Sequence, residues 1–209
     1  MDGFTYWIVA CLAAFTVGLG KGGVPVVTAM AVPIMSLKMS PVLAAGLLLP
    51  VFIMADMFGL YAYRKTFNAR VLKIMMVAMP FGVFIGYMTS ASVPETMVTL
   101  VIGLIGAIFA LSMILRKPVS QEPQEARLKP GLFWGVITGF TSFVSHSGGP
   151  PYQVYTLPLR MDKITFAGTV VIAFAYINII KLIPYYALGQ LSLDNMRVAI
   201  LMLIPAVCG

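Results

Sequence analysis

The chain has 209 residues, of which 60% are hydrophobic and 10% are charged, and its mean hydropathy is +0.95. This composition excludes a soluble domain of that length and predicts a membrane protein with the lipid bilayer as its surroundings. The formal net charge is +7, but no polar stretch is long enough to form a nucleic-acid-binding domain. We therefore expect no nucleic-acid partner and attribute the basic residues to orientation in the bilayer.

The apolar windows predict the fold class. Windows with no charged residue, or with one, cover 4–20, 24–37, 39–63, 74–94, 96–115, 130–159 and 164–193. Several approach the roughly 20 residues that cross a bilayer as a helix, and they are continuously apolar rather than alternating. The sequence thus predicts an all-α, polytopic membrane protein. The first three residues lack the basic segment of a signal peptide, so the first window is expected to belong to the mature protein.

The predicted elements form two units joined by a linker. The first unit, 1–116, contains a broken helical hairpin over 4–36 and helices over 41–63, 72–93 and 96–115. The linker, 117–129, is polar, contains two prolines and has no hydrophobic period, which predicts an exposed loop. The second unit, 130–209, contains a broken hairpin over 131–159, a helix over 164–188 and the start of a helix over 197–209.

The two units are copies of each other. An offset of 125 or 126 residues aligns Gly22-Gly23 with Gly148-Gly149, Pro25 with Pro151, Pro33 with Pro158, Lys38 with Lys163, Tyr61 with Tyr186 and Pro80 with Pro205. Such an offset indicates an internal repeat. Because the first copy extends much further beyond its last aligned proline, the second copy is expected to lack about 32 residues, the rest of one helix and one further helix.

Basic residues in short loops predict the orientation, because Lys and Arg are enriched on the cytoplasmic side. Loop 64–73 and loop 116–129 each contain four Lys or Arg residues, so both are expected to be cytoplasmic. The corner at 89–95 has no Lys or Arg and is expected outside, as is the N-terminus. In this topology the two hairpins enter the bilayer from opposite faces, so the repeat is inverted, as in many secondary transporters.

Two glycine- and proline-rich stretches, 18–25 and 141–151, interrupt the apolar sequence at matched positions of the repeat. Helix breaks persist inside a membrane where protein or a water-filled cavity satisfies the backbone, and the half-helices that follow present N–H groups that attract anions. The expected anion-binding residues are Lys21, Gly22, Gly23, Thr141, Ser142, Ser145, His146, Ser147, Gly148 and Gly149. The alternative is that glycine and proline only kink the helices and let them pack closely.

Four intramembrane residues are candidates for coupling or support. His146 is the only histidine and could take up or release a proton with the anion, or be a neutral packing residue. Asp56 and Lys181 occupy equivalent positions of the repeat, so they are expected either to pair with each other or to contact substrate. Asn178 lies three residues before Lys181, on the same helix face.

Metal, cofactor and enzyme chemistry are not indicated. Cys11 and Cys208 have no CxxC spacing and the methionines are scattered, so we expect neither a metal site nor a cofactor. Ser145 and His146 are adjacent in sequence, whereas a catalytic Ser–His pair usually comes from different elements. We therefore expect a protein that is not an enzyme.

The sequence resembles a known family of transporters. The segments Gly139–Pro151 (GFTSFVSHSGGPP), Phe166–Thr169 (FAGT) and Asn178–Tyr186 (NIIKLIPYY), with the start GLGKGG at 18–23, resemble the TauE/SafE family of sulfite-exporter or toluene-sulfonate-uptake permeases. Ser147 departs from the pattern, in which a small residue, often Ala, is expected. The resemblance implies a multi-pass protein of a bacterial-type inner membrane that transports sulfur-containing or organic anions.

Together these features predict a secondary transporter that moves a small anion of the sulfite or sulfonate class by alternating access, with proton coupling as an option. The alternatives are an anion channel and a membrane scaffold that transports nothing. The expected partners are the small anionic substrate and the lipid bilayer, and a homo-oligomer is left open.

Overall fold

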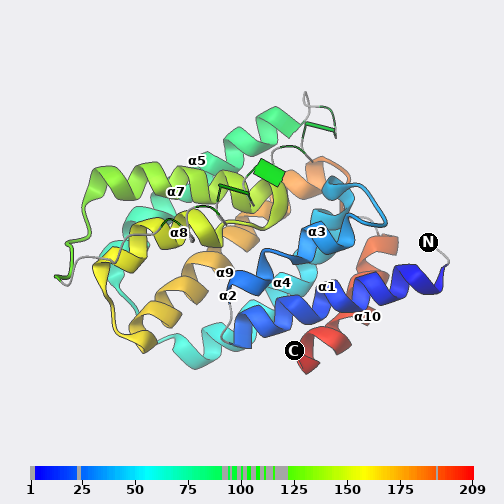
Figure 1. The fold of residues 1–209 in the computed structure, drawn as a ribbon, viewed down its shortest axis with the longest axis horizontal. Coiled ribbons are helices and arrows are strands. Elements are labelled where there is room, and N and C mark those ends of the chain that lie inside the picture. Colours follow the sequence, from blue (N-terminus) through cyan, green and yellow to red (C-terminus); the bar gives the residue numbers. More distant parts are fainter. Residues whose placement is uncertain are drawn as a thin grey trace.

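The computed structural model describes residues 3–22, 25–90, 94, 96–97, 100, 103–104, 107–108, 111, 115, 122–191 and 193–209. Its elements are α1 (Phe4–Gly22), α2 (Pro25–Thr28), α3 (Ala31–Met35), α4 (Pro41–Tyr63), α5 (Ala69–Ser90), α7 (Leu128–Ser145), α8 (Gly149–Thr156), the 3₁₀ helix η1 (Leu157–Leu159), α9 (Lys163–Ala187) and α10 (Leu193–Cys208) (Figure 1). The described residues contain helices and no strand, which confirms the all-α prediction. Most of the helix expected over 96–115, and the first part of the linker, lie outside the described residues.

The glycine and proline motifs coincide with helix ends. In the first unit α1 ends at Gly22 and α2 begins at Pro25. In the second unit α7 ends at Ser145, and α8 begins at Gly149 with prolines in its first turn. Proline suits a first helical turn because the N–H that it lacks would have no intrahelical partner there. Each unit therefore holds a long helix followed by a short one at the break.

Polar side chains set the start of the three long central helices. Ser40 accepts a hydrogen bond from the backbone N–H of Leu43 at the start of α4. Asn68 accepts from Val71 at 3.1 Å, so α5 begins at Ala69 instead of the expected residue 72. Asp162 accepts from the first turn of α9, from Ile164 N at 3.1 Å and Thr165 N at 3.0 Å. Such N-caps satisfy backbone donors that the helix itself leaves unpaired.

The helix packing follows a two-fold pattern. Helices α4 and α9 pack against each other, α5 packs on α7 and α9, and α10 packs on α1 and α4. Under the repeat offset α4 corresponds to α9, α5 to α10 and α1 to α7, so the α5–α7 contact corresponds to the α10–α1 contact and the α5–α9 contact to the α10–α4 contact. Figure 1 shows α1 beside α10 and α5 beside α7 on different sides of the molecule. This arrangement is the one that an internal repeat produces.

Glycines allow the closest of these approaches. A Cβ on Gly82 of α5 would lie 2.0 Å from the carbonyl oxygen of Val136 on α7, and a Cβ on Gly18 of α1 would lie 2.0 Å from that of Ala206 on α10. Small residues permit this backbone contact between helices in a membrane.

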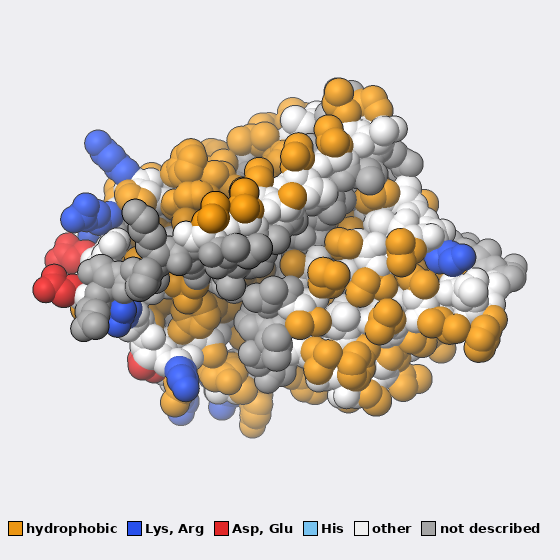
Figure 2. Space-filling view, viewed as in Figure 1, with side chains coloured by type: hydrophobic (Ala, Val, Ile, Leu, Met, Phe, Trp, Pro, Cys, Tyr) orange, Lys and Arg blue, Asp and Glu red, His pale blue; other side chains and the backbone are white. Residues whose placement is uncertain are grey.

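The surface fits a bilayer. Four described helical segments are long and apolar enough to cross it: Phe4–Lys21, Pro41–Tyr63, Ala69–Ser90 and Lys163–Ala187. Large apolar side chains are exposed along them, such as Phe4, Phe81 and Ile183. Figure 2 shows hydrophobic side chains spread over much of the visible face and most of the visible charged side chains at one end. The protein is therefore a multi-pass membrane protein.

Candidate anion-binding site

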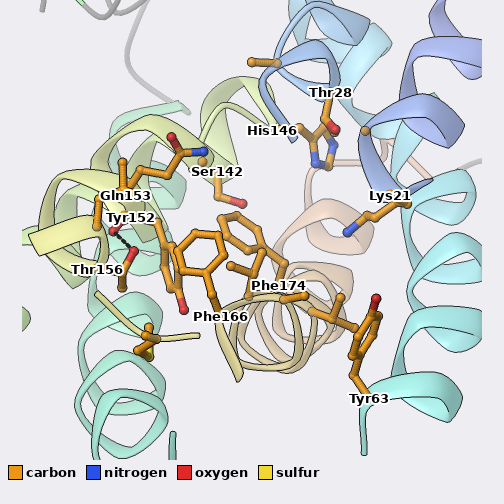
Figure 3. Close-up of a pocket in the computed structure, with 18 of the residues that line it drawn as sticks. Lys21, Thr28, Tyr63, Ser142, His146, Tyr152, Gln153, Thr156, Phe166 and Phe174 are labelled. Carbon is orange, nitrogen blue, oxygen red and sulfur yellow. Dashed lines mark hydrogen bonds between the residues drawn. The ribbon is translucent and has the colours of Figure 1, made fainter. Parts of the chain in front are cut away.

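A cavity of about 500 Å³ lies at the two helix breaks. Its polar lining comes from both units: Lys21 and Thr28 from the first, and Ser142, His146, Gln153 and Asn178 from the second. In Figure 3 the Lys21 side chain extends into the cavity from α1, facing Ser142 and His146 across it. Of the residues expected to bind the anion, Lys21, Ser142, His146 and Gly149 line this cavity.

Lys21 forms an ion pair with Asp56 of α4. Asp56 is completely buried, and its second carboxylate oxygen accepts a 2.6 Å hydrogen bond from the Asn178 amide of α9. The Lys21 side chain is 21% exposed, so its ammonium group is shared between the carboxylate and the cavity. This network joins three helices and both units.

Lys181 lies behind the cavity wall with no exposed surface. Its Nζ donates to the carbonyl oxygen of Ser142 at 3.0 Å and to the Ser142 hydroxyl at 3.1 Å, and it lies 2.8 Å from His146 Nδ1. The Ser142 hydroxyl accepts this bond and keeps its own hydrogen for a partner. Because Ser142 lines the cavity, Lys181 is one hydrogen bond away from a hydroxyl that a ligand can reach.

The His146 ring is fixed on every side. Its Nε2 lies 2.9 Å from the carbonyl oxygen of Ala45, so Nε2 carries a hydrogen, and in the neutral ring Nδ1 then accepts from Lys181. Phe52 stacks on the ring at a centroid distance of 4.4 Å. The backbone of His146 is left-handed, with φ of 53°, a conformation that costs a non-glycine residue about 1–2 kcal/mol. This conformation ends α7, and a left-handed residue is a common way for a helix to end.

Other predicted residues lie near the cavity without lining it. The hydroxyl of Thr141 donates to the Ile137 carbonyl at 2.9 Å, that of Ser145 to Thr141 at 3.4 Å and that of Ser147 to Ser145 at 3.2 Å. These bonds to the local backbone are the usual choice of Ser and Thr in and after a helix.

The adjacent glycines differ in their surroundings. A Cβ on Gly148 would lie 2.9 Å from both the Ser142 Cβ and the Thr138 carbonyl oxygen, so glycine is needed there for packing. A Cβ on Gly149 would meet nothing within 4 Å. Gly22 ends α1, and Gly23 lies outside the described residues.

The short helices offer fewer free backbone donors than the sequence suggested. Helix α2 has four residues, too few to build a dipole, since helix partial charges accumulate over aligned peptide units. In α8 the prolines at 150 and 151 carry no N–H, and the Tyr152 N–H is bonded to the Gly148 carbonyl at 3.2 Å. The cationic and hydroxyl side chains are therefore the main donors to the cavity.

Asp56 and Lys181 were expected either to pair with each other or to contact substrate, and the direct pair does not form. Asp56 binds Lys21 and Asn178, whereas Lys181 binds Ser142 and His146. The equivalence of Asp56 and Lys181 in the repeat places them on the two central helices, but it does not fix the direction of either side chain. Each finds a partner within its own unit.

Sequence reasoning missed the aromatic wall and the mouth of the cavity. Phe52, Tyr152, Phe166 and Phe174 form much of the apolar lining, and Tyr63, Arg160 and Lys163 lie at one end. Helical spacing in the sequence could have indicated these residues. Tyr152 and Thr156 are four residues apart on α8, so they lie on one helix face. Phe166, Val170 and Phe174 likewise repeat every four residues on α9. Arg160, like His146, has a positive φ, 48°.

Among the described residues, no group of three or more His, Cys, Asp and Glu side chains is arranged to hold a metal ion.

The structure is that of a multi-pass helical membrane protein with a polar cavity at paired helix breaks, an arrangement found in many membrane transporters. Residues 6–209 match the family model described as Sulfite exporter TauE/SafE. The chain belongs to this family, which confirms the resemblance seen in the sequence and supports membrane transport of anions. No curated protein and no solved structure gives a match to the chain.

Proposed function

We propose that this protein is a secondary transporter of a small sulfur-containing or organic anion, of the sulfite or sulfonate class, in the inner membrane of the cell. The observation that carries the proposal is the convergence of Lys21, Ser142, His146 and Asn178 on one cavity at the helix breaks. The family supports anion transport in general, and this donor set favours an oxyanion.

The donors fit the chemistry of an oxyanion. Sulfonate, sulfite and carboxylate oxygens only accept hydrogen bonds, and a charged donor strengthens such a bond. Lys21 contributes a full charge, and the Ser142 hydroxyl is polarised by Lys181. The aromatic side chains of Phe166 and Phe174 supply an apolar surface for the organic part of a substrate. A cavity of about 500 Å³ lies within the size range of small-molecule sites.

Alternating access would expose this site to one face of the membrane at a time. The mouth residues Arg160 and Lys163 lie on the side that we propose to be cytoplasmic, with loops 64–73 and 116–129, and the N-terminus on the outer side. On the far side of the cavity, His146 is bonded to Ala45 and stacked on Phe52. Movement of one unit against the other, as in transporters built from inverted repeats, would have to break these contacts of His146 with Ala45 and Phe52.

Proton coupling through His146 is part of the proposal. Its imidazole lines the cavity and touches the buried Lys181, so its protonation state would respond to a bound anion. In His146→Gln we expect slower transport and a changed pH profile, because an amide can form similar hydrogen bonds but does not titrate. Unchanged rate and unchanged pH profile would exclude this role.

The test is reconstitution in lipid vesicles with sulfite, thiosulfate, sulfoacetate, methanesulfonate and acetate as substrates. We expect saturable uptake and counterflow of at least one of the sulfur oxyanions. Lys21→Met removes a charged donor worth about 1.5–3 kcal/mol, so we expect affinity to fall roughly 10- to 150-fold. Lys129→Met, on the exposed start of α7, is the matched control and is expected to transport normally.

Two outcomes would replace the proposal. Flux that rises linearly with concentration and shows no counterflow would indicate an anion channel. Absence of both binding and flux for every anion would indicate a membrane scaffold.

A further inference from the structure

Lys181 is a buried basic side chain without a carboxylate partner among its hydrogen bonds. It has no exposed surface, and its acceptors are the Ser142 carbonyl, the Ser142 hydroxyl and His146 Nδ1, all of which are neutral. A buried charge is costly unless an opposite charge compensates it. A protonated Lys181 therefore has no direct counter-ion among its hydrogen-bond partners.

Lys181 and His146 can hold only one positive charge between them. His146 Nε2 faces the Ala45 carbonyl and must carry a hydrogen, so only Nδ1 changes state. The 2.8 Å between Nδ1 and Lys181 Nζ accommodates one hydrogen, either on an ammonium next to a neutral ring or on an imidazolium next to an amine. Two protonated groups would point hydrogens at each other. Such a pair titrates as a unit.

The remaining charged groups around the pair cancel. Lys21 on α1 and Asp56 on α4 form an ion pair. The other titratable groups next to the pair are Tyr185 on α9, whose hydroxyl donates to the Phe143 carbonyl at 2.6 Å, and Tyr152 on α8, and both are neutral phenols around neutral pH. Tyr63, Arg160 and Lys163 line the end of the same cavity. Among the groups next to the pair, the net charge is thus +1 with the pair protonated and zero without.

We infer that the Lys181–His146 pair takes up one proton together with each monovalent anion that enters the cavity. This inference rests on the proposed function and specifies its coupling: the proton belongs to the pair, with Lys181 as a coupling residue in addition to His146. The bound anion contacts the Ser142 hydroxyl on the cavity side, and the shared proton lies directly behind it. Anion and proton compensate each other's charge, so each favours the binding of the other.

The proton balance is simple. A hydronium ion on the side to which the cavity opens loses one O–H bond and becomes water, and its proton forms an N–H bond at the nitrogen lone pair of Lys181. The Ser142 hydroxyl, 3.1 Å from Nζ and in the cavity lining, provides the relay. When the anion leaves, the proton leaves with it. One cycle therefore moves one anion and one proton and no net charge.

The same charge count predicts selectivity. A monovalent anion brings the protonated site to zero net charge, whereas a divalent anion such as sulfate leaves an uncompensated negative charge in an apolar surrounding. We expect sulfate to bind at least 10-fold more weakly than methanesulfonate, which carries a single charge at all relevant pH values.

The first experiment counts protons on binding. Purified protein in detergent and weak buffer, with a pH-indicator dye, is titrated with methanesulfonate at a series of pH values between about 5 and 9. We expect proton uptake to rise to about one per anion over that range. Binding without proton uptake at every pH overturns this inference and leaves the transporter proposal standing. Absence of binding by any anion overturns both.

The second experiment separates the proton from the charge. Lys181→Arg keeps the positive charge but does not release its proton, so in vesicles we expect anion exchange to persist while accumulation driven by a pH gradient is lost. Lys181→Met should lose proton uptake on binding, and Lys129→Met is the matched control. Full pH-driven accumulation by Lys181→Arg, or wild-type uptake that depends on membrane potential, contradicts the inference. Because wild-type proton counting needs no variant, the inference stays testable if Lys181→Met does not fold.

Discussion

Replacement of Asp56 by Asn tests whether the Lys21–Asp56 pair stabilises the fold. The carboxylate is completely buried, and it accepts hydrogen bonds from Lys21 and Asn178. Asparagine keeps the shape and removes the charge, so Lys21 loses its counter-ion. Removal of one partner of a buried pair costs about 3–5 kcal/mol. Because the Lys21 side chain is 21% exposed, we expect the lower end, about 3 kcal/mol, or roughly 150-fold in the folding equilibrium.

The assay is reversible denaturation in detergent micelles, followed by circular dichroism. The double variant Lys21→Met/Asp56→Asn completes a double-mutant cycle, and Glu125→Gln on the exposed linker is the control, expected within about 0.5 kcal/mol of wild type. In the double variant no charge is left unpaired, so its loss should be smaller than the sum of the single losses by at least 1 kcal/mol. Additivity within about 0.5 kcal/mol would mean that the pair is not coupled and would refute the reasoning.

Three further predictions follow from the same structure. Gly148→Ala should lower stability by about 1–3 kcal/mol, because its methyl group would be overpacked. Gly149→Ala, at the neighbouring position, should change stability little. Thermal unfolding of both variants tests this, and equal effects would contradict the packing argument. Hydrogen bonds from the side chain and backbone of Thr165, and from the backbone of Ile164, lower the pKa of Asp162. The ionised carboxylate therefore stabilises α9 at pH values above the pKa that Asp162 has in the unfolded chain. This stabilisation is lost as the pH falls through the lower pKa of the folded protein. Asp162→Asn should therefore reduce the drop in melting temperature between pH 6 and pH 3, and an unchanged drop contradicts the cap. Phe67→Cys, in a variant without the two native cysteines, should react with a membrane-impermeant thiol reagent in inside-out vesicles only; labelling from outside intact cells would reverse the proposed topology.

The helices could be predicted because the sequence encodes them locally. The apolar runs are long, and the residues that end them are glycine, proline or an N-cap such as Asn68 or Asp162. The internal repeat also predicts that the two helix breaks occupy equivalent positions, because it aligns glycines and prolines that are far apart in the chain. Neither argument needs the tertiary structure.

The cavity lining could be predicted only in part, because it depends on how each helix is rotated. Ser142 and His146 are four residues apart and face the cavity, whereas Thr141 and Ser145 are equally spaced on an adjacent stripe and bond their own helix. Residue type alone does not tell which of the two helix faces lines the cavity. The partner of Asp56 was missed for a similar reason, since the direction of a side chain is set by neighbouring helices.

The pairing of the charged residues has a consequence for how the chain enters the membrane during synthesis. A single charge at the centre of a helix costs roughly 2.5–3.5 kcal/mol during insertion. Lys21 and Asp56 are 35 residues apart, and Lys181 reaches its partners Ser142 and His146 across 39 and 35 residues. By contrast, the bonds between the units, His146 to Ala45 and Asn178 to Asp56, span 101 and 122 residues.

Each half of the chain can thus cover its own charges before the other half has left the ribosome. At roughly 5–20 residues per second, Asn178 emerges about 6–24 seconds after Asp56. During that interval the Lys21–Asp56 pair keeps the first unit stable in lipid. The long-range bonds form last, so the complete cavity exists only once both halves are in place.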